Sequence, residues 1–203
     1  MSDLLVLVER FVASFEKLDE MSADAVLDPV AWQLGTGDRN QYDRKRWRPI
    51  RVNTPLDALG VIYAKLPVRF PPLYEQLVLS YRWAEVDLQA YRLLANPPGP
   101  NLSGLLEEMS RDSIIWNSLR AAGYVQFGKG PDIDYDPICF DLNSRKKNRE
   151  CRIVKIDHEH ILCHDRIKVI GELAPTFRQL VLNTIDKANT VTRKVSGHME
   201  PKD

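Results

Sequence analysis

The sequence has no apolar run that approaches the roughly 20 residues needed for a membrane-spanning helix. The run at residues 4–8 is interrupted at once by Glu9 and Arg10, and it lacks the basic start and the small-residue cleavage site of a signal peptide. The chain has only three cysteines and no Cys-x-x-Cys pair, which favours reduced thiols. We therefore expect a cytoplasmic protein.

An excess of charge of one sign is also absent. Lys and Arg number 28 and Asp and Glu number 28, so the formal net charge is zero. No global field therefore draws the chain to nucleic acid or to anionic lipid. With 203 residues, of which 44% are hydrophobic, the chain is long enough to bury one full core.

Motifs for catalysis are missing as well. The sequence contains neither a Gly-x-Ser-x-Gly nucleophile elbow nor a phosphate-binding glycine-rich loop. Asp132, Asp134 and Asp136 begin like a calcium-binding EF-hand loop, but its sixth position is Pro137 and its twelfth is Asn143. We therefore predict no catalytic residue, no cofactor and no bound metal.

The feature that organises the chain is the stretch from 123 to 160. It contains three short runs rich in β-branched and aromatic residues, divided by Gly, Pro, Asp and Asn, which is typical of an antiparallel meander. The middle run alternates three apolar residues with two others, Ile138, Phe140 and Leu142 against Cys139 and Asp141. We expect one face of this strand to be buried and the other to be wet.

Apolar residues at helical spacing, with capping residues and prolines at the starts, predict helices around this meander. They fall in segments 4–18, 54–66, 70–81, 101–122 and 175–188, with further strands over 82–88 and 166–170. Residues from 189 onward are polar and are expected to be frayed. The predicted fold class is α+β, a twisted antiparallel sheet with helices packed against it.

A group of potential metal ligands follows the last run of the meander, and it supports an alternative interpretation as a metal-dependent enzyme. It comprises Asp157, His158, Glu159, His160, Cys163 and His164. His160 and His164 would share a face only on a helix, whereas the Ile-Val-Lys-Ile run before them predicts a strand. The sequence therefore favours one buried, hydrogen-bonded histidine and others in solvent.

A second alternative is nucleic-acid binding by a basic segment. Its cations and aromatics are Arg39, Arg44, Lys45, Arg46, Arg48 and Arg51 with Tyr42 and Trp47. Such residues can grip phosphates and stack on bases. A solvated loop whose aromatics pin it to the core explains the same pattern, since Asp38 and Asp43 lie among the cations.

Taken together, the pattern resembles the SUKH superfamily, which includes fungal cell-wall regulators and many bacterial immunity proteins encoded beside toxins. The likeness lies in the proline-led helix at 66–79, the runs at 135–141 and 153–159, and the late helix with Phe177. It implies an α+β binding module without catalytic activity or cofactor, whose bacterial members neutralise toxins, often nucleases, by direct contact. Tyr81, Arg82 and Trp83 stand where small members often have an Asn-Gly turn, and the insert at 93–122 is also unusual.

This resemblance suggests three parts: an N-terminal helix and extension at 1–53, a SUKH-like domain at 54–188 and a flexible tail at 189–203. The expected partner is a toxin domain, with no membrane, nucleic acid or small-molecule substrate. Its expected contacts are acidic: Asp132, Asp134, Asp136, Asp157 and Glu159. A cationic nuclease would be steered by such charge. One strand separates this acidic turn from a basic tip at 145–149, so the two patches should lie roughly 15–20 Å apart and not cancel.

Overall fold

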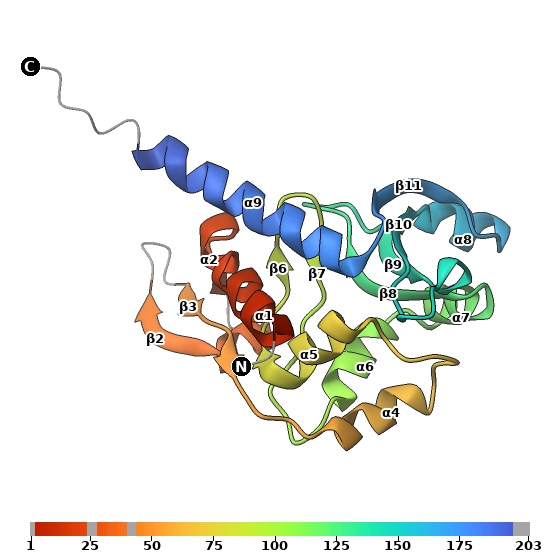
Figure 1. Cartoon of the computed structure of the whole chain (residues 1–203), viewed down its shortest axis with the longest axis horizontal. Coiled ribbons are helices and arrows are strands. Elements are labelled where there is room, and N and C mark those ends of the chain that lie inside the picture. The colour runs from red at the N-terminus through yellow and green to blue at the C-terminus, as the bar shows by residue number, and fades with distance from the viewer. Residues whose placement is uncertain (1–2, 24–27, 40–43, 197–203) are drawn as a thin grey trace, which may run out of the picture.

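The computed structural model describes residues 3–23, 28–39 and 44–196, and its centre is a six-stranded sheet (Figure 1). The strands are β6 (Val86–Asp87), β7 (Arg92–Leu93), β8 (Tyr124–Lys129), β9 (Pro137–Asp141), β10 (Arg152–Ile156) and β11 (Val169–Ala174). They lie in chain order, and each neighbouring pair is antiparallel. The predicted α+β fold with an antiparallel meander is confirmed.

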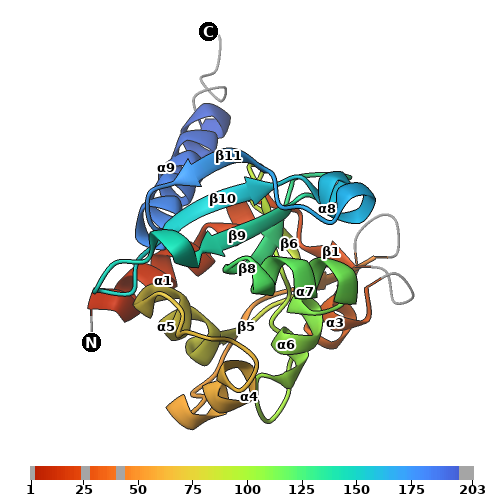
Figure 2. The ribbon, with the colours of Figure 1, turned by 90° about the vertical axis from the view of Figure 1, so that its right-hand side faces the viewer.

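Helices cover both faces of the sheet (Figure 2). One face packs against α1 (Asp3–Ala13), α5 (Pro72–Ser80) and α9 (Phe177–Ser196). The other packs against α7 (Ser113–Ala121) and α8 (His158–His164). The buried residues form two hydrophobic clusters, one on each face of the sheet, and successive residues of a strand enter different ones. Phe140 and Ile153 belong to the larger cluster, whereas Cys139 and Val154 belong to the smaller.

The expectation of a wet face on β9 was wrong. Every residue of β9 is buried, with Cys139 at 0% exposure and Asp141 at 1%. The reason is the second helical layer, because α7 and α8 cover the face that the alternating pattern assigned to solvent. The Asp141 carboxylate is accommodated there by Arg152, whose guanidinium lies 2.7 Å away.

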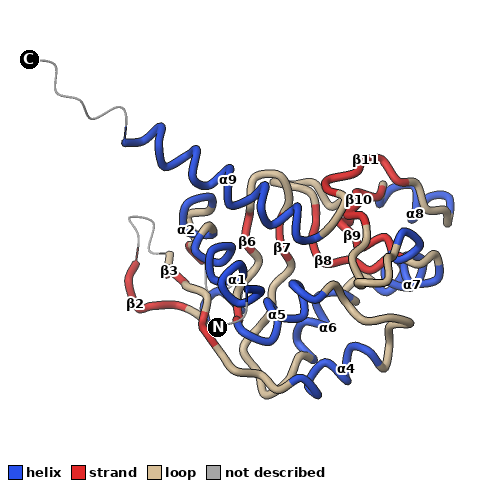
Figure 3. The backbone as a smooth tube through the Cα atoms, in the orientation of Figure 1, coloured by secondary structure: helices blue, strands red, loops and turns tan. Residues whose placement is uncertain are grey.

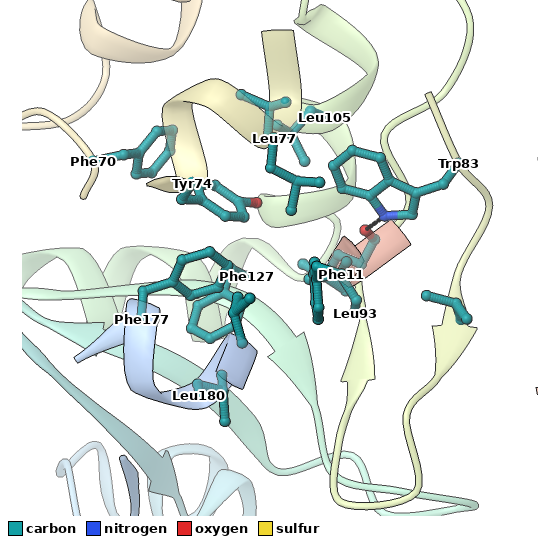
Figure 4. Packing of buried hydrophobic residues seen from close by; sticks show 14 of the residues in the cluster. Phe11, Phe70, Tyr74, Leu77, Trp83, Leu93, Leu105, Phe127, Phe177 and Leu180 are labelled. Atoms are coloured by element: carbon teal, nitrogen blue, oxygen red, sulfur yellow. Dashed lines mark hydrogen bonds between the residues drawn. The ribbon is translucent and has the colours of Figure 1, made fainter. Parts of the chain in front are cut away.

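The larger cluster is built on aromatic rings. Phe140 stacks on Phe127 at 4.3 Å between ring centroids, and Tyr74 and Phe177 meet it edge-on at 5.1 and 5.7 Å. Figure 4 shows Tyr74, Phe127 and Phe177 converging from α5, β8 and α9. In the same view the buried Trp83 indole donates a hydrogen bond of 2.9 Å to the Leu94 carbonyl. Rings that pack in this way hold the helices and the sheet in one arrangement.

The N-terminal region adds α2 (Phe15–Leu18), α3 (Pro29–Gln33) and a three-stranded sheet of β1 (Ser22–Ala23), β3 (Lys45–Trp47) and β2 (Gly35–Arg39). Figure 3 shows β2 and β3 apart from the main sheet. β4 (Ile50–Arg51) pairs with β5 (Tyr81–Arg82). Leu7, Val8 and Phe11 of α1 join the cluster that contains Phe140, so the described part of the 1–53 segment shares a core with the rest.

Three further expectations need correction. The helix expected over 101–122 is two helices, α6 (Ser103–Met109) and α7, because Asp112 caps the second through the N–H groups of Ile114 and Ile115. The strand expected over 82–88 is split between β5 and β6. The tail expected to fray from 189 continues α9 to Ser196, and residues 197–203 lie outside the described part.

The remaining helical turns are η1 (Leu56–Leu59), α4 (Gly60–Tyr63) and η2 (Leu142–Ser144). Within the described ranges, no helix has both the length and the apolar composition to span a bilayer.

Phe140→Ala should lower the free energy of unfolding by about 3–5 kcal/mol, because it removes a buried ring and leaves a cavity among others. Urea denaturation measures this. Leu56→Ala, at a side chain 61% exposed, is the control and should change stability by less than about 0.5 kcal/mol. A Phe140→Ala effect no larger than the control would contradict the placement.

Candidate functional site

The acidic turn between β8 and β9, residues 130–136, is closed by its own backbone. The Gly130 N–H donates to the Asp136 carbonyl and the Asp134 N–H to the Pro131 carbonyl, each at 2.9 Å. The Asp134 carboxylate accepts the Asp136 N–H, also at 2.9 Å. Asp132 adopts the left-handed region with φ 51°, which aspartate tolerates in turns. The chain therefore reverses within a tight hydrogen-bonded loop.

Two of its carboxylates are held by residues further along the chain. Lys155 Nζ lies 2.5 Å from Asp134 Oδ2 and 3.2 Å from Asp136 Oδ2. The backbone N–H of His158 and its ring Nδ1 contact Asp136 Oδ1 at 3.0 and 2.7 Å. Lys155 therefore offsets part of the negative charge of Asp134 and Asp136, and His158 holds Asp136 by hydrogen bonds.

The electrostatics of Asp136 reflect this environment. Burial alone would raise the pKa of its carboxyl, but the hydrogen bonds from His158 and Lys155 outweigh burial and hold the pKa below its usual range. The hydrogen bond to Asp134 in turn raises the pKa of the Lys155 ammonium. In the folded protein the Asp136 carboxylate and the Lys155 ammonium are thus both favoured in their charged forms.

Arg92 braces the turn from the β7 side. Its Nε donates to the Gly130 carbonyl at 2.9 Å and its Nη2 to the Asp134 carbonyl at 3.0 Å. The Glu85 carboxylate orients this guanidinium, with Oε1 3.2 Å from Arg92 Nη1. Its Oε2 atom lies 2.6 Å from Lys129 Nζ. The Arg92 guanidinium carbon lies 5.9 Å from the centroid of the Tyr135 ring, within reach of a cation–π contact.

The braced backbone leaves two large apolar side chains in solvent. Ile133 is 85% exposed and Tyr135 is 60% exposed. Beside Tyr135 opens a groove of about 400 Å³, lined by Leu94, Ile115, Leu162 and His158 among others. Leu162 itself is 48% exposed, so the groove and the turn form one partly apolar surface.

Sequence reasoning placed the histidine group on a strand and a turn, and this was wrong. Residues 158–164 form α8 because the Asp157 carboxylate caps it, accepting the His160 N–H at 2.9 Å. That hydrogen bond, followed by one from Lys168 at 3.0 Å, lowers the pKa of Asp157. Asp157 is thus a structural cap, whereas Glu159 is exposed in the first helical turn.

On α8 the rings of His160 and His164 do share a face, with centroids 4.8 Å apart. Cys163 is exposed, while Cys139 and Cys151 are buried, and burial raises the pKa of the Cys151 thiol to about 12. Across the described residues, no three His, Cys, Asp or Glu side chains are arranged to hold a metal ion.

In the basic segment, several aromatic and cationic groups are engaged within the protein. Trp47 is only 3% exposed and is therefore not available to stack on bases. Arg48 and Arg51 lie 3.4 and 2.9 Å from Glu16 and Glu9. Tyr42 lies outside the described residues.

The sequence did not single out Ile133 and Tyr135. The available signal was two large apolar residues placed between aspartates in a turn, where polar residues are usual. The braces from Arg92, Lys155 and His158 join segments far apart in the chain, so no local pattern could reveal them.

Comparisons of the chain with protein-family models, with curated proteins and with solved structures found no match. The likeness to the SUKH superfamily therefore rests on the residues named above.

Asp136→Asn should destabilise the protein by about 1–3 kcal/mol at pH 7, since it leaves the Lys155 and His158 donors without their charged acceptor. Because the folded carboxyl has a pKa below its unfolded value of about 3.9, this contribution is full at neutral pH and disappears as the pH falls below about 4. Urea denaturation at pH 7 and pH 3 measures the gap between wild type and variant.

The control for this experiment is Asp132→Asn, at an exposed position in the same turn, which should be nearly neutral at both pH values. A gap that is absent at pH 7, or that widens toward pH 3, would refute the role assigned to Asp136.

Proposed function

We propose that the protein is a non-catalytic binding module that contacts a partner protein through the 130–136 turn and the adjoining surface of α8. The observation that carries this proposal is a braced turn that displays Ile133 and Tyr135 to solvent. In line with the SUKH resemblance, we propose further that it is a bacterial immunity protein and that the partner is the cognate toxin domain.

The energetics of association favour such a turn. Tyrosine is enriched among the residues that dominate binding energy, and it brings a large amphipathic surface with few rotatable bonds. A loop whose backbone is already fixed loses little further conformational freedom on binding. The Tyr135 ring has two neighbours, since the Arg92 guanidinium carbon lies 5.9 Å and the His158 ring centroid 6.4 Å from its centroid.

The charge left on this surface is smaller than the sequence suggested. Asp132 and Glu159 are exposed, and neither side chain forms an ion pair with any described residue. Asp134, Asp136 and Asp157 act in the proposal as supports for the turn and the helix. Asp132 and Glu159 would attract a cationic toxin and speed its association. The apolar side chains of Ile133 and Tyr135 would supply the affinity.

The test is co-expression with the toxin domain encoded by the adjacent gene, followed by binding kinetics of the purified pair. The double variant Ile133→Ser/Tyr135→Ser should weaken affinity by about 30-fold or more, mainly through faster dissociation, and abolish protection. Its melting temperature should stay close to that of wild type, because both side chains already face solvent.

The matched control is Val6→Ser/Ile50→Ser, at side chains 41% and 46% exposed on another part of the molecule. It should bind as wild type does. Unchanged affinity for the turn variant would overturn the proposed surface, and so would loss of protection only on changing Lys146 and Lys147 in the basic tip. The absence of a toxin domain beside the gene would argue against immunity.

A further inference from the structure

A second hollow lies at the other end of β9 from the 130–136 turn. It measures about 620 Å³ and is bordered by η1, α4 and the start of α5. In Figures 1 and 2, α4 forms the lower edge of the molecule, below α5. Most of the lining is apolar, from Leu56, Leu59, Gly60 and Tyr63, and its volume suits a small organic molecule.

One carboxylate in this hollow, that of Glu75, is largely buried and forms hydrogen bonds through only one of its two oxygens. Glu75 is 8% exposed, and its Oε1 atom accepts hydrogen bonds from the Tyr63 hydroxyl at 2.6 Å and from Arg149 Nη1 at 2.7 Å. Its Oε2 atom makes no hydrogen bond with any described residue. This atom is also accessible to solvent, so a ligand can reach it. A carboxylate oxygen in such surroundings favours a charged donor.

The Tyr63 hydroxyl is already engaged within the protein. Burial, and then the hydrogen bond to Glu75, raise the pKa of its hydroxyl, so the proton stays on the oxygen and is donated to Glu75. The Phe70 N–H occupies the hydroxyl oxygen from the other side at 3.1 Å. Tyr63 therefore contributes its ring face, and Glu75 contributes the remaining polar atom.

The rest of the rim fits the same kind of ligand. Two leucines supply apolar surface to the lining. Leu56 is 61% exposed, whereas Leu59 is buried. Asp57 adds a second carboxylate to the lining, against one guanidinium from Arg69, which lies over the Tyr63 ring at 6.0 Å. With Arg149 bound to Glu75, the two carboxylates are matched by two guanidiniums, so the polar feature left for a ligand is the Glu75 Oε2 atom beside the apolar lining.

We infer that this hollow binds a small primary amine with an aliphatic or aromatic body. The ammonium group would donate to Glu75 Oε2, and the apolar body would lie against Leu56, Leu59 and the Tyr63 ring. This inference does not depend on the partner surface at the 130–136 turn, because no residue of that turn or of the groove beside it lines this hollow.

The test uses the full chain and three probes that separate the two halves of the recognition. Hexylamine carries the ammonium and the apolar body, hexan-1-ol keeps only the body, and methylamine keeps only the charge. In titrations followed by NMR, hexylamine should bind at least about tenfold more tightly than either other probe, since a charge-assisted hydrogen bond contributes about that factor. Shifts should centre on the amides of 56–63 and 75.

Two variants locate the site. Glu75→Gln should weaken hexylamine binding about tenfold or more while keeping a polar group in place. Gly60→Leu should also weaken it, because Gly60 lines the hollow and an added Cβ there meets no atom within 4 Å. Gly171→Leu in β11, which likewise meets nothing within 4 Å, is the matched control and should leave binding unchanged.

Equal binding of hexylamine and hexan-1-ol would overturn the role of the carboxylate. Hexylamine binding that survives in both Glu75→Gln and Gly60→Leu would place the amine elsewhere on the surface and overturn the site.

Discussion

Burial of β9 on both faces is the constraint on which the rest of the structure depends. Phe140 points into the aromatic cluster under α5 and α9, and Cys139 points into the smaller cluster under α7 and α8. A strand enclosed in this way cannot shift its register by one residue without placing both side chains in the wrong layer. The turn before β9 and the basic tip after it are therefore held at opposite ends of a fixed element.

The charge distribution follows from that frame. Helix α8 begins directly after β10, so the backbone N–H of His158 and the ammonium of Lys155 both reach the turn before β9. Negative charge is thereby compensated within the protein, and the apolar side chains of Ile133 and Tyr135 become the features presented to solvent. At the other end Arg149 reaches Glu75, which ties the tip to α5. The same strand thus organises both candidate sites.

The sequence predicted the meander and the burial of Phe140 because strand runs bounded by turn residues carry a local signal. It did not predict α8, which is one short helix directly after a strand, although Asp157 ahead of it was a usable N-cap signal. It also did not predict the side-chain pairs of the acidic turn, because Asp134–Lys155 and Asp136–His158 join residues about twenty positions apart. Side-chain contacts at that separation depend on the sheet register, which local patterns do not specify.

The central claim is that the free protein already holds the 130–136 turn in the conformation that displays Ile133 and Tyr135. Backbone ¹⁵N relaxation of the isolated protein tests this most directly. The account predicts order parameters of about 0.85 for the amides of 132–136, equal to those of β8 and β9. Values below about 0.6 in the turn, with rigid neighbouring strands, would contradict it.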